Sequence, residues 1–197
     1  IKVILLTEVV FLRNKKVFKG NFFHAPTYGK AEYLEKTLIV VNEKGIIEKV
    51  LSQSNPAYQS VLLESKADNS LVDFGEKFIL PGFVDLHIHA PQWPQAGVAL
   101  DEPLNVWLDE CTFPLEAKYK DITFAKKVYT DLVRQLLNRG TTTAVYFATQ
   151  HLESSIELAK ISALMGQRAL VGKVAMDNPE QTHDYYRAES SEQAIES

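Results

Sequence analysis

Residues 81–89 read PGFVDLHIH and directly follow the apolar residues 78–80. Pro and Gly interrupt the apolar pattern, so we expect a strand at about residues 83–87. The strand is predicted to be buried on both faces, as strands of a parallel sheet are. Side chains alternate between the faces of a strand, so His87 and His89 are predicted to project from the same face.

Two imidazoles on one side of a strand end form half of a zinc or iron site. An α/β barrel keeps its chemistry at the C-terminal ends of its strands, which is where this pair lies. Two histidines in a short window also arise by chance, and the buried strand is what favours the metal site. Asp85 shares the histidines' face and is expected to accept an imidazole N–H or a backbone N–H rather than to bind the metal.

Strand and helix signals alternate after residue 78. The clearest helix is predicted from Asp121 to Arg139, with apolar residues every three or four positions and Gly140 at its end. A strand is predicted at residues 141–147, a helix beginning at Ser154 or Ser155, and a third strand at residues 169–176. This order predicts an α/β fold with a parallel sheet.

Residues 1–77 have a different pattern, with short β-branched runs near residues 3–6, 9–12, 37–41, 45–50 and 71–74. A hairpin connection is predicted at residues 42–45. The polar stretches 19–33 and 52–70 are expected to be loops.

The chain has 197 residues and a net charge of −4, which argues against a nucleic-acid surface. No apolar run approaches the roughly 20 residues of a membrane span. The single cysteine, Cys111, excludes an internal disulfide and fits a reducing, cytoplasmic location. It is expected to be a buried small hydrophobe.

A barrel needs about 200 residues or more, and only three strand–helix repeats follow residue 78. The sequence also stops inside a predicted helix that Ser190 or Ser191 would cap. We therefore expect an N-terminal part of a longer protein, incomplete at its C-terminus.

Several further segments continue the pattern in a fixed order. They are TFPLE at residues 112–116, GTTTAVYFAT at 140–149 and GQRALVGKVAMD at 166–177. Together with the PGxxDxHxH signature they resemble the guanine deaminases of the amidohydrolase superfamily, over residues 37–186. The signature alone marks the superfamily, and the other three segments narrow it to the guanine branch.

The resemblance implies a metal-dependent (β/α)8 barrel, here partial from residue 78, with residues 1–77 forming part of a small β-sandwich domain. It implies one zinc ion per complete site, with iron as an alternative, bound in part by His87 and His89. The remaining ligands and the proton-shuttle glutamate are expected beyond residue 197. No catalytic residue is therefore assigned in this chain, and the piece alone is expected to be inactive.

The implied reaction is hydrolytic deamination of guanine to xanthine and ammonia by a zinc-activated water, in purine catabolism or salvage. The partner would be a small purine, in a cytoplasmic homodimer without membrane or nucleic acid. Gln92, His89 and Trp93 are the residues implied in substrate binding. An amide such as that of Gln92 offers both donors and acceptors. The alternatives are an exposed loop glutamine for Gln92 and simple packing for Trp93.

Other readings remain open. A sibling amidohydrolase could act on another aminated or chlorinated heterocycle, and a non-catalytic relative could keep the fold as a scaffold. The deaminases with His-x-Glu and Pro-Cys-x-x-Cys are excluded by the single cysteine. The remaining histidines, His24, His151 and His183, are expected at the surface, and Lys173 is expected to be structural.

Overall fold

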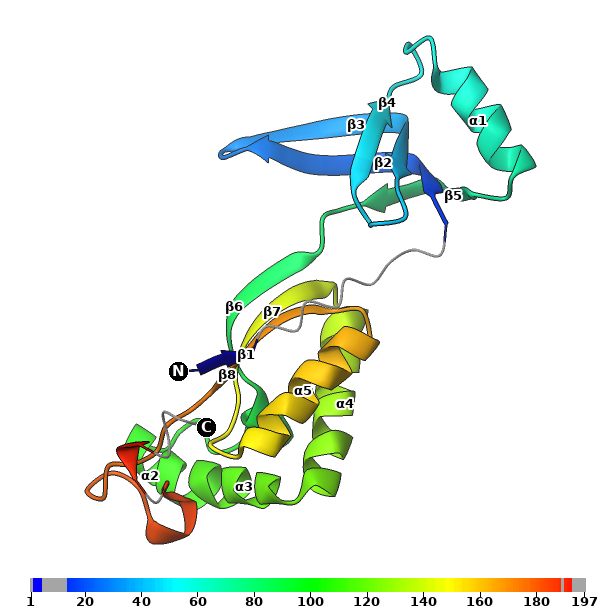
Figure 1. The fold of residues 1–197 in the computed structure, drawn as a ribbon. Helices are drawn as coiled ribbons and strands as arrows, with labels where there is room; N and C mark the ends of the chain where they lie inside the picture. The colour runs from blue at the N-terminus through cyan, green and yellow to red at the C-terminus, as the bar shows by residue number, and fades with distance from the viewer. Residues whose placement is uncertain (1, 5–13, 189, 193–197) are drawn as a thin grey trace. The chain divides into compact units, whose positions relative to one another are not determined.

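The computed structural model describes residues 2–4, 14–188 and 190–192. Its contacts divide the chain into two compact units, Val9–Pro81 and Ile1–Glu8 with Gly82–Ser197 (Figure 1). The predicted boundary at residues 77 and 78 lies close to this division. The predicted strand at residues 9–12 lies outside the described residues.

The smaller unit is built on a four-stranded sheet in the order β4-β3-β2-β5. The pairs β2–β3 and β3–β4 are antiparallel, and β5 runs parallel to β2. One helix, α1, joins β4 to β5. The elements are β2 Lys16–Thr27, β3 Lys30–Val41, β4 Ile47–Leu51, α1 Tyr58–Ala67 and β5 Leu71–Ile79.

The loop predicted at residues 19–33 is wrong, because most of it forms the long β2–β3 hairpin. Thr27 pairs with Lys30, so the hairpin closes over the two residues Tyr28 and Gly29. Gly29 has φ of 76°, a left-handed conformation that glycine adopts without steric cost. The second predicted hairpin, at residues 42–45, is confirmed between β3 and β4.

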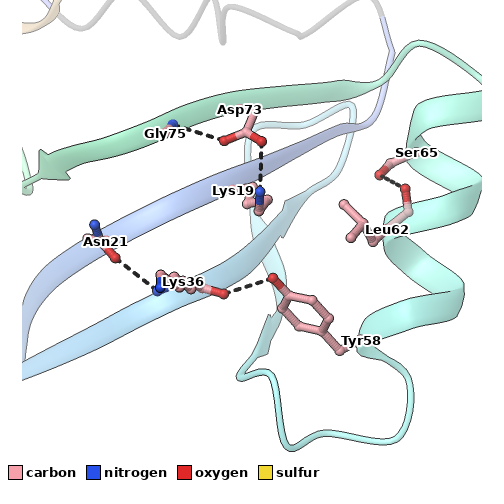
Figure 2. Close-up of polar contacts among 8 residues, drawn as sticks. All are labelled: Lys19, Asn21, Lys36, Tyr58, Leu62, Ser65, Asp73 and Gly75. Atoms are coloured by element: carbon pink, nitrogen blue, oxygen red, sulfur yellow. Dashed lines mark hydrogen bonds and ion pairs between the residues drawn. The ribbon is translucent and has the colours of Figure 1, made fainter.

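The loop predicted at residues 52–70 is also wrong, since α1 lies within it. Tyr58, Val61 and Ser65 are the buried residues of this helix, at helical spacing. The Tyr58 hydroxyl donates to the Lys36 carbonyl at 2.9 Å, which ties the helix to β3 (Figure 2). The Lys36 N–H in turn donates to Asn21 Oδ1 at 3.0 Å (Figure 2).

Across the parallel pair, Lys19 of β2 binds Asp73 of β5 at 2.8 Å (Figure 2). The described residues of this unit contain one sheet and one helix, so the second layer of the expected β-sandwich is not among them. The sandwich therefore remains a prediction.

The larger unit has the sheet order β1-β8-β7-β6. Strands β6, β7 and β8 are parallel, and β1 runs antiparallel to β8. The short β1 thus pairs with the larger unit, although all of residues 1–77 had been predicted to belong to the small domain. The strands are β1 Lys2–Ile4, β6 Phe83–His89, β7 Thr141–Phe147 and β8 Arg168–Lys173.

Helices connect the parallel strands in the predicted alternation. Helix α4, Ile122–Asn138, precedes β7, and helix α5, Leu152–Leu164, joins β7 to β8. Asp121 caps α4 by accepting the Thr123 N–H at 2.8 Å. Helix α5 begins two residues before the first predicted start. Shorter helical segments between β6 and α4 are Ala90–Gln95 (3-10), α2 Leu104–Trp107, Leu108–Thr112 (π), α3 Phe113–Ala117 and Lys118–Lys120 (3-10), and Asp184–Tyr186 (3-10) follows β8.

Helices α4 and α5 pack side by side, and the core of this unit lies between them and one face of the sheet (Figure 1). Ala144 and Tyr146 of β7 and Val171 of β8 face this core. The alternation of β7 places Phe147 on the opposite face. The barrel expectation is supported to this extent: the described residues supply parallel β-α units of an α/β fold.

Strand β6 is the edge strand of this sheet. The prediction that it is buried on both faces is wrong for this chain, because Phe83, Val84 and Leu86 are 62%, 59% and 68% exposed. Only Ile88 of this strand packs against the core of the unit. Among the described residues, no helix is long and apolar enough to span a bilayer.

Candidate functional site

The two predicted metal ligands lie together at the C-terminal end of β6. His87 Nε2 and His89 Nε2 are 3.1 Å apart. The backbone N–H of His87 donates to Asp85 Oδ1 at 3.1 Å, so this carboxylate holds the strand end rather than an imidazole ring. The pairing of the imidazoles on one face follows from the strand's alternation.

The distance between the two nitrogens suits a shared metal ion. Two nitrogens bound to one tetrahedral zinc ion at about 2.0–2.1 Å would lie about 3.3 Å apart. The observed separation of 3.1 Å is close to this value. The same distance also fits a hydrogen bond in which one protonated Nε2 donates to the other.

The electrostatics of the pair favour the ligand form of His89. Burial, and then the charge of His87, lowers the pKa of His89 below its ordinary value. A metal ligand must be the neutral imidazole, so a lowered pKa reduces the competition from protons.

Phe147 at the end of β7 packs against both imidazoles, with ring centroids 4.4 Å from His87 and 5.1 Å from His89. His89 and Phe147 are partners in the parallel register of β6 and β7. The sequence predicts that Phe147 shapes the barrel interior and takes no part in the chemistry; its contact with the histidine pair is not predicted. Its ring covers one side of the pair, although His87 and His89 both remain exposed in this chain.

Within the described part of the chain, no group of three or more His, Cys, Asp or Glu side chains is arranged to hold a metal ion. His183 is exposed, as predicted, and faces an acidic side chain at 3.2 Å. His24 is partly exposed and also faces an acidic side chain at 3.2 Å. The surface prediction for His151 is wrong, since this residue is only partly exposed and its Nε2 is buried. Cys111 is partly exposed rather than buried.

Gln92 lies three residues after His89, in the 3-10 segment that follows β6. Its Nε2 donates to Glu116 Oε1 at 3.1 Å. The Tyr186 hydroxyl donates to the other carboxylate oxygen, Oε2, at 2.6 Å. Burial raises the pKa of Glu116, and these two hydrogen bonds partly oppose that rise.

Glu116 is the last residue of the TFPLE motif, and the sequence analysis does not predict it as a site residue. It is 7% exposed, which is rare for a glutamate unless its carboxylate is paired or hydrogen bonded. Its position at the end of the TFPLE motif was the available signal.

Trp93 lies differently from Gln92. Its Nε1 donates to Asp131 Oδ2 on α4 at 2.9 Å, and its ring packs against the core beneath the sheet. These contacts favour the packing alternative for Trp93 over a role beside the substrate.

The chain is similar to known proteins along most of its length. The model of the amidohydrolase family matches residues 78–197. The chain is 43% identical over 188 residues to guanine deaminase of Dictyostelium discoideum, covering 91% of this chain and 41% of that protein. It is 40% identical over 182 residues to guanine deaminase of Homo sapiens, covering 91% and 39%.

Among solved structures, guanine deaminase from C. acetobutylicum with bound guanine in the active site has a TM-score of 0.81 and 37% identity. This match covers 93% of the chain and 41% of that structure's chain. The chain therefore spans about two fifths of the length of the relatives it matches. The family match covers the strand with the histidine pair and every β-α unit described above, and the chain belongs to the amidohydrolase family.

Proposed function

We propose that the full-length protein hydrolyses guanine to xanthine and ammonia. This chain would contribute some of the metal-binding and substrate-binding residues of the site. The observation that carries the proposal is the convergence of His87 Nε2 and His89 Nε2 at a strand end, with Gln92 three residues further on. The similarity to guanine deaminases over 91% of the chain supports guanine as the substrate.

His87 and His89 would hold a zinc ion through their Nε2 atoms. When bound, such an ion supplies a water that is activated for attack near neutral pH. The lowered pKa of His89 favours the neutral ring that a metal ligand requires, and Phe147 stacks on that ring. The reaction replaces the exocyclic amino group of guanine by oxygen from water and releases ammonia.

Gln92 would bind the purine edge. Gln92 lies in the 3-10 segment that begins directly after His89, so a purine held by its amide would have its reacting carbon near the imidazole pair. We propose that the purine also contacts His89 directly. We do not propose such a contact for Trp93, because its indole N–H donates to Asp131.

The complete site would contain further ligands and a proton-shuttling carboxylate from outside this chain, in a barrel with a small β-sandwich domain. We further propose a cytoplasmic homodimer that takes a small purine, with zinc preferred and iron as the alternative. Zinc is favoured because two imidazoles with an open position suit a hydrolytic zinc site.

The test is ammonia release from guanine, adenine and cytosine by the zinc-loaded full-length protein, with metal content measured in parallel. We expect turnover of guanine alone. His87→Ala should lower the zinc content and abolish turnover. His24→Ala removes a partly exposed histidine of the smaller unit and should change neither. Turnover of a different heterocycle would favour a sibling amidohydrolase, and zinc content unchanged by His87→Ala would overturn the ligand assignment.

A further inference from the structure

The carboxylate of Glu116 is buried against the amide of Gln92, and the proposed chemistry does not use it. One carboxylate oxygen accepts from Gln92 Nε2 at 3.1 Å and the other accepts from the Tyr186 hydroxyl at 2.6 Å. The residue is 7% exposed, and burial of an ionised carboxylate is costly. Glu116 is therefore held by hydrogen bonds to both carboxylate oxygens and is not a solvated surface group.

This arrangement fixes the polarity of the Gln92 amide. An ionised carboxylate only accepts hydrogen bonds, so the amide must turn its NH₂ group toward Glu116. The reverse orientation would place the amide oxygen against a carboxylate oxygen. The oxygen of Gln92, which accepts no hydrogen bond from a described residue, is thereby left to face away from Glu116.

The backbone that carries Gln92 is held as well. The Tyr119 hydroxyl donates to the Pro91 carbonyl at 2.8 Å, one residue before Gln92. Gln95 Nε2 donates to Thr112 Oγ1 at 2.7 Å, three residues after it. With the segment held on both sides, the freedom left to Gln92 is rotation within its side chain, and the hydrogen bond to Glu116 restricts it.

We propose that Glu116 is a positioning residue that fixes the Gln92 amide with its oxygen toward the ligand, so that the site selects a purine offering an N–H donor at that point. This inference rests on the proposed function, because it assumes that Gln92 binds the purine. Guanine has ring N–H and exocyclic amino donors, and a site built on such a contact rejects an analogue that lacks the donor.

The test compares Glu116→Gln, Gln92→Ala and the double variant in the zinc-loaded full-length protein, with guanine as substrate. An amide at position 116 can donate or accept, so the Gln92 amide is no longer held in one orientation. A lost contact made equally in the ground state and the transition state raises KM and leaves kcat nearly unchanged. We expect Glu116→Gln to raise KM up to about tenfold, the size expected for loss of one hydrogen bond between the uncharged Gln92 amide and the purine.

The double variant separates positioning from a general loss of structure. If Glu116 acts through Gln92, the double variant should have the same KM as Gln92→Ala, because the two effects are not additive. Tyr146→Phe is the matched control: it removes a buried hydroxyl that donates to Gln167 at 2.7 Å, on the helix-facing side of β7. It should lower stability without changing KM.

An unchanged KM in Glu116→Gln, or additive effects in the double variant, would overturn the inference while guanine turnover by the wild type stands. Absence of guanine turnover by the wild type would instead overturn the proposed function. In that case the inference is tested by crystal structures of the wild type and of Glu116→Gln. An unmoved Gln92 amide in the variant would contradict the inference, and a rotated amide would support it. If Glu116→Gln does not fold, Glu116→Asp withdraws the carboxylate by one methylene and should give the same rise in KM.

Discussion

Two stacked tyrosines in the core of the larger unit differ in one hydrogen bond, and this difference predicts different changes in stability on loss of the hydroxyl. Tyr119 and Tyr129 are both fully buried, and their ring centroids are 5.1 Å apart. The Tyr119 hydroxyl donates to the Pro91 carbonyl at 2.8 Å. The Tyr129 hydroxyl is buried and has no hydrogen-bond partner among the described residues.

Tyr119→Phe keeps the ring contacts but leaves the buried Pro91 carbonyl without its donor. The expected loss in the free energy of unfolding is about 1–3 kcal/mol, the cost of a buried polar group left unpaired. Tyr129→Phe removes a hydroxyl that is already unpaired, so we expect a change of about 0 kcal/mol or a small gain in stability. Burial raises the pKa of both phenols, so both hydroxyls are protonated at neutral pH and the comparison involves no charge.

The assay is urea denaturation of the wild type and both variants in the full-length protein, followed by circular dichroism. Equal slopes with different midpoints would assign the change to stability and not to the denatured state. The reasoning is refuted if Tyr129→Phe destabilises as much as Tyr119→Phe, because that would place the effect in the ring environment and not in the hydrogen bond.

Three further predictions concern the larger unit. Asp121→Ala should cost about 1 kcal/mol in the free energy of unfolding by removing the cap of α4, and Asp121→Asn, which keeps an acceptor for the Thr123 N–H, should cost less than half of that in the same urea experiment. Gly82→Ala should destabilise by about 1–3 kcal/mol, because a new Cβ would clash with the Thr142 side chain; Thr142→Gly in the same protein should recover most of the loss, and no recovery would place the strain elsewhere. Burial, followed by the charges of two nearby lysines, lowers the pKa of His151. Below about pH 6.5 the unfolded chain therefore binds a proton that the folded chain does not, and the stability should fall as the pH drops through this range. A denaturation midpoint that falls equally in His151→Gln would exclude this histidine as the source of the pH dependence.

The elements that the sequence predicted well are those with an unbroken period and clear ends. Strand β7 spans the predicted residues, and α4 has its predicted cap and its predicted glycine end. The histidine pair was predicted from the alternation of a single strand, so no distant contact was needed to place the two rings together.

The elements that were missed lack such local signals. Helix α1 has no side-chain cap, since Ala57 precedes it, and its buried face is formed by only Tyr58, Val61 and Ser65. The β2–β3 hairpin is mostly exposed on its distal half and contains many polar residues, so its strands do not show the alternation of a half-buried sheet. The hairpin is formed by pairing between the two strands, and the local sequence pattern does not specify that pairing.

The rest of the site depends on contacts between distant residues. Phe147 meets the histidines through the register of two parallel strands, and Glu116 meets Gln92 and Tyr186 through the packing of three segments. The apolar composition of β6 predicts a strand buried on both faces. In this structure β6 is instead an edge strand, and of its residues only Ile88 packs against the core. Such features depend on which segments meet, and local periodicity does not determine this.

The hydrogen bonds around Glu116 also have a consequence for the order in which the molecule folds. The β2–β3 hairpin closes over two residues, and hairpins form in about 1–10 μs. Gln92 and Glu116 are 24 residues apart, and Glu116 and Tyr186 are 70 residues apart. Contacts between such distant residues require closure of long loops and slow the folding of proteins that depend on them. The amide of Gln92 is therefore expected to gain its fixed orientation late in folding, after β6, β7, β8 and their helices have assembled, so that a chain with most of its secondary structure in place would still lack a defined ligand-binding group.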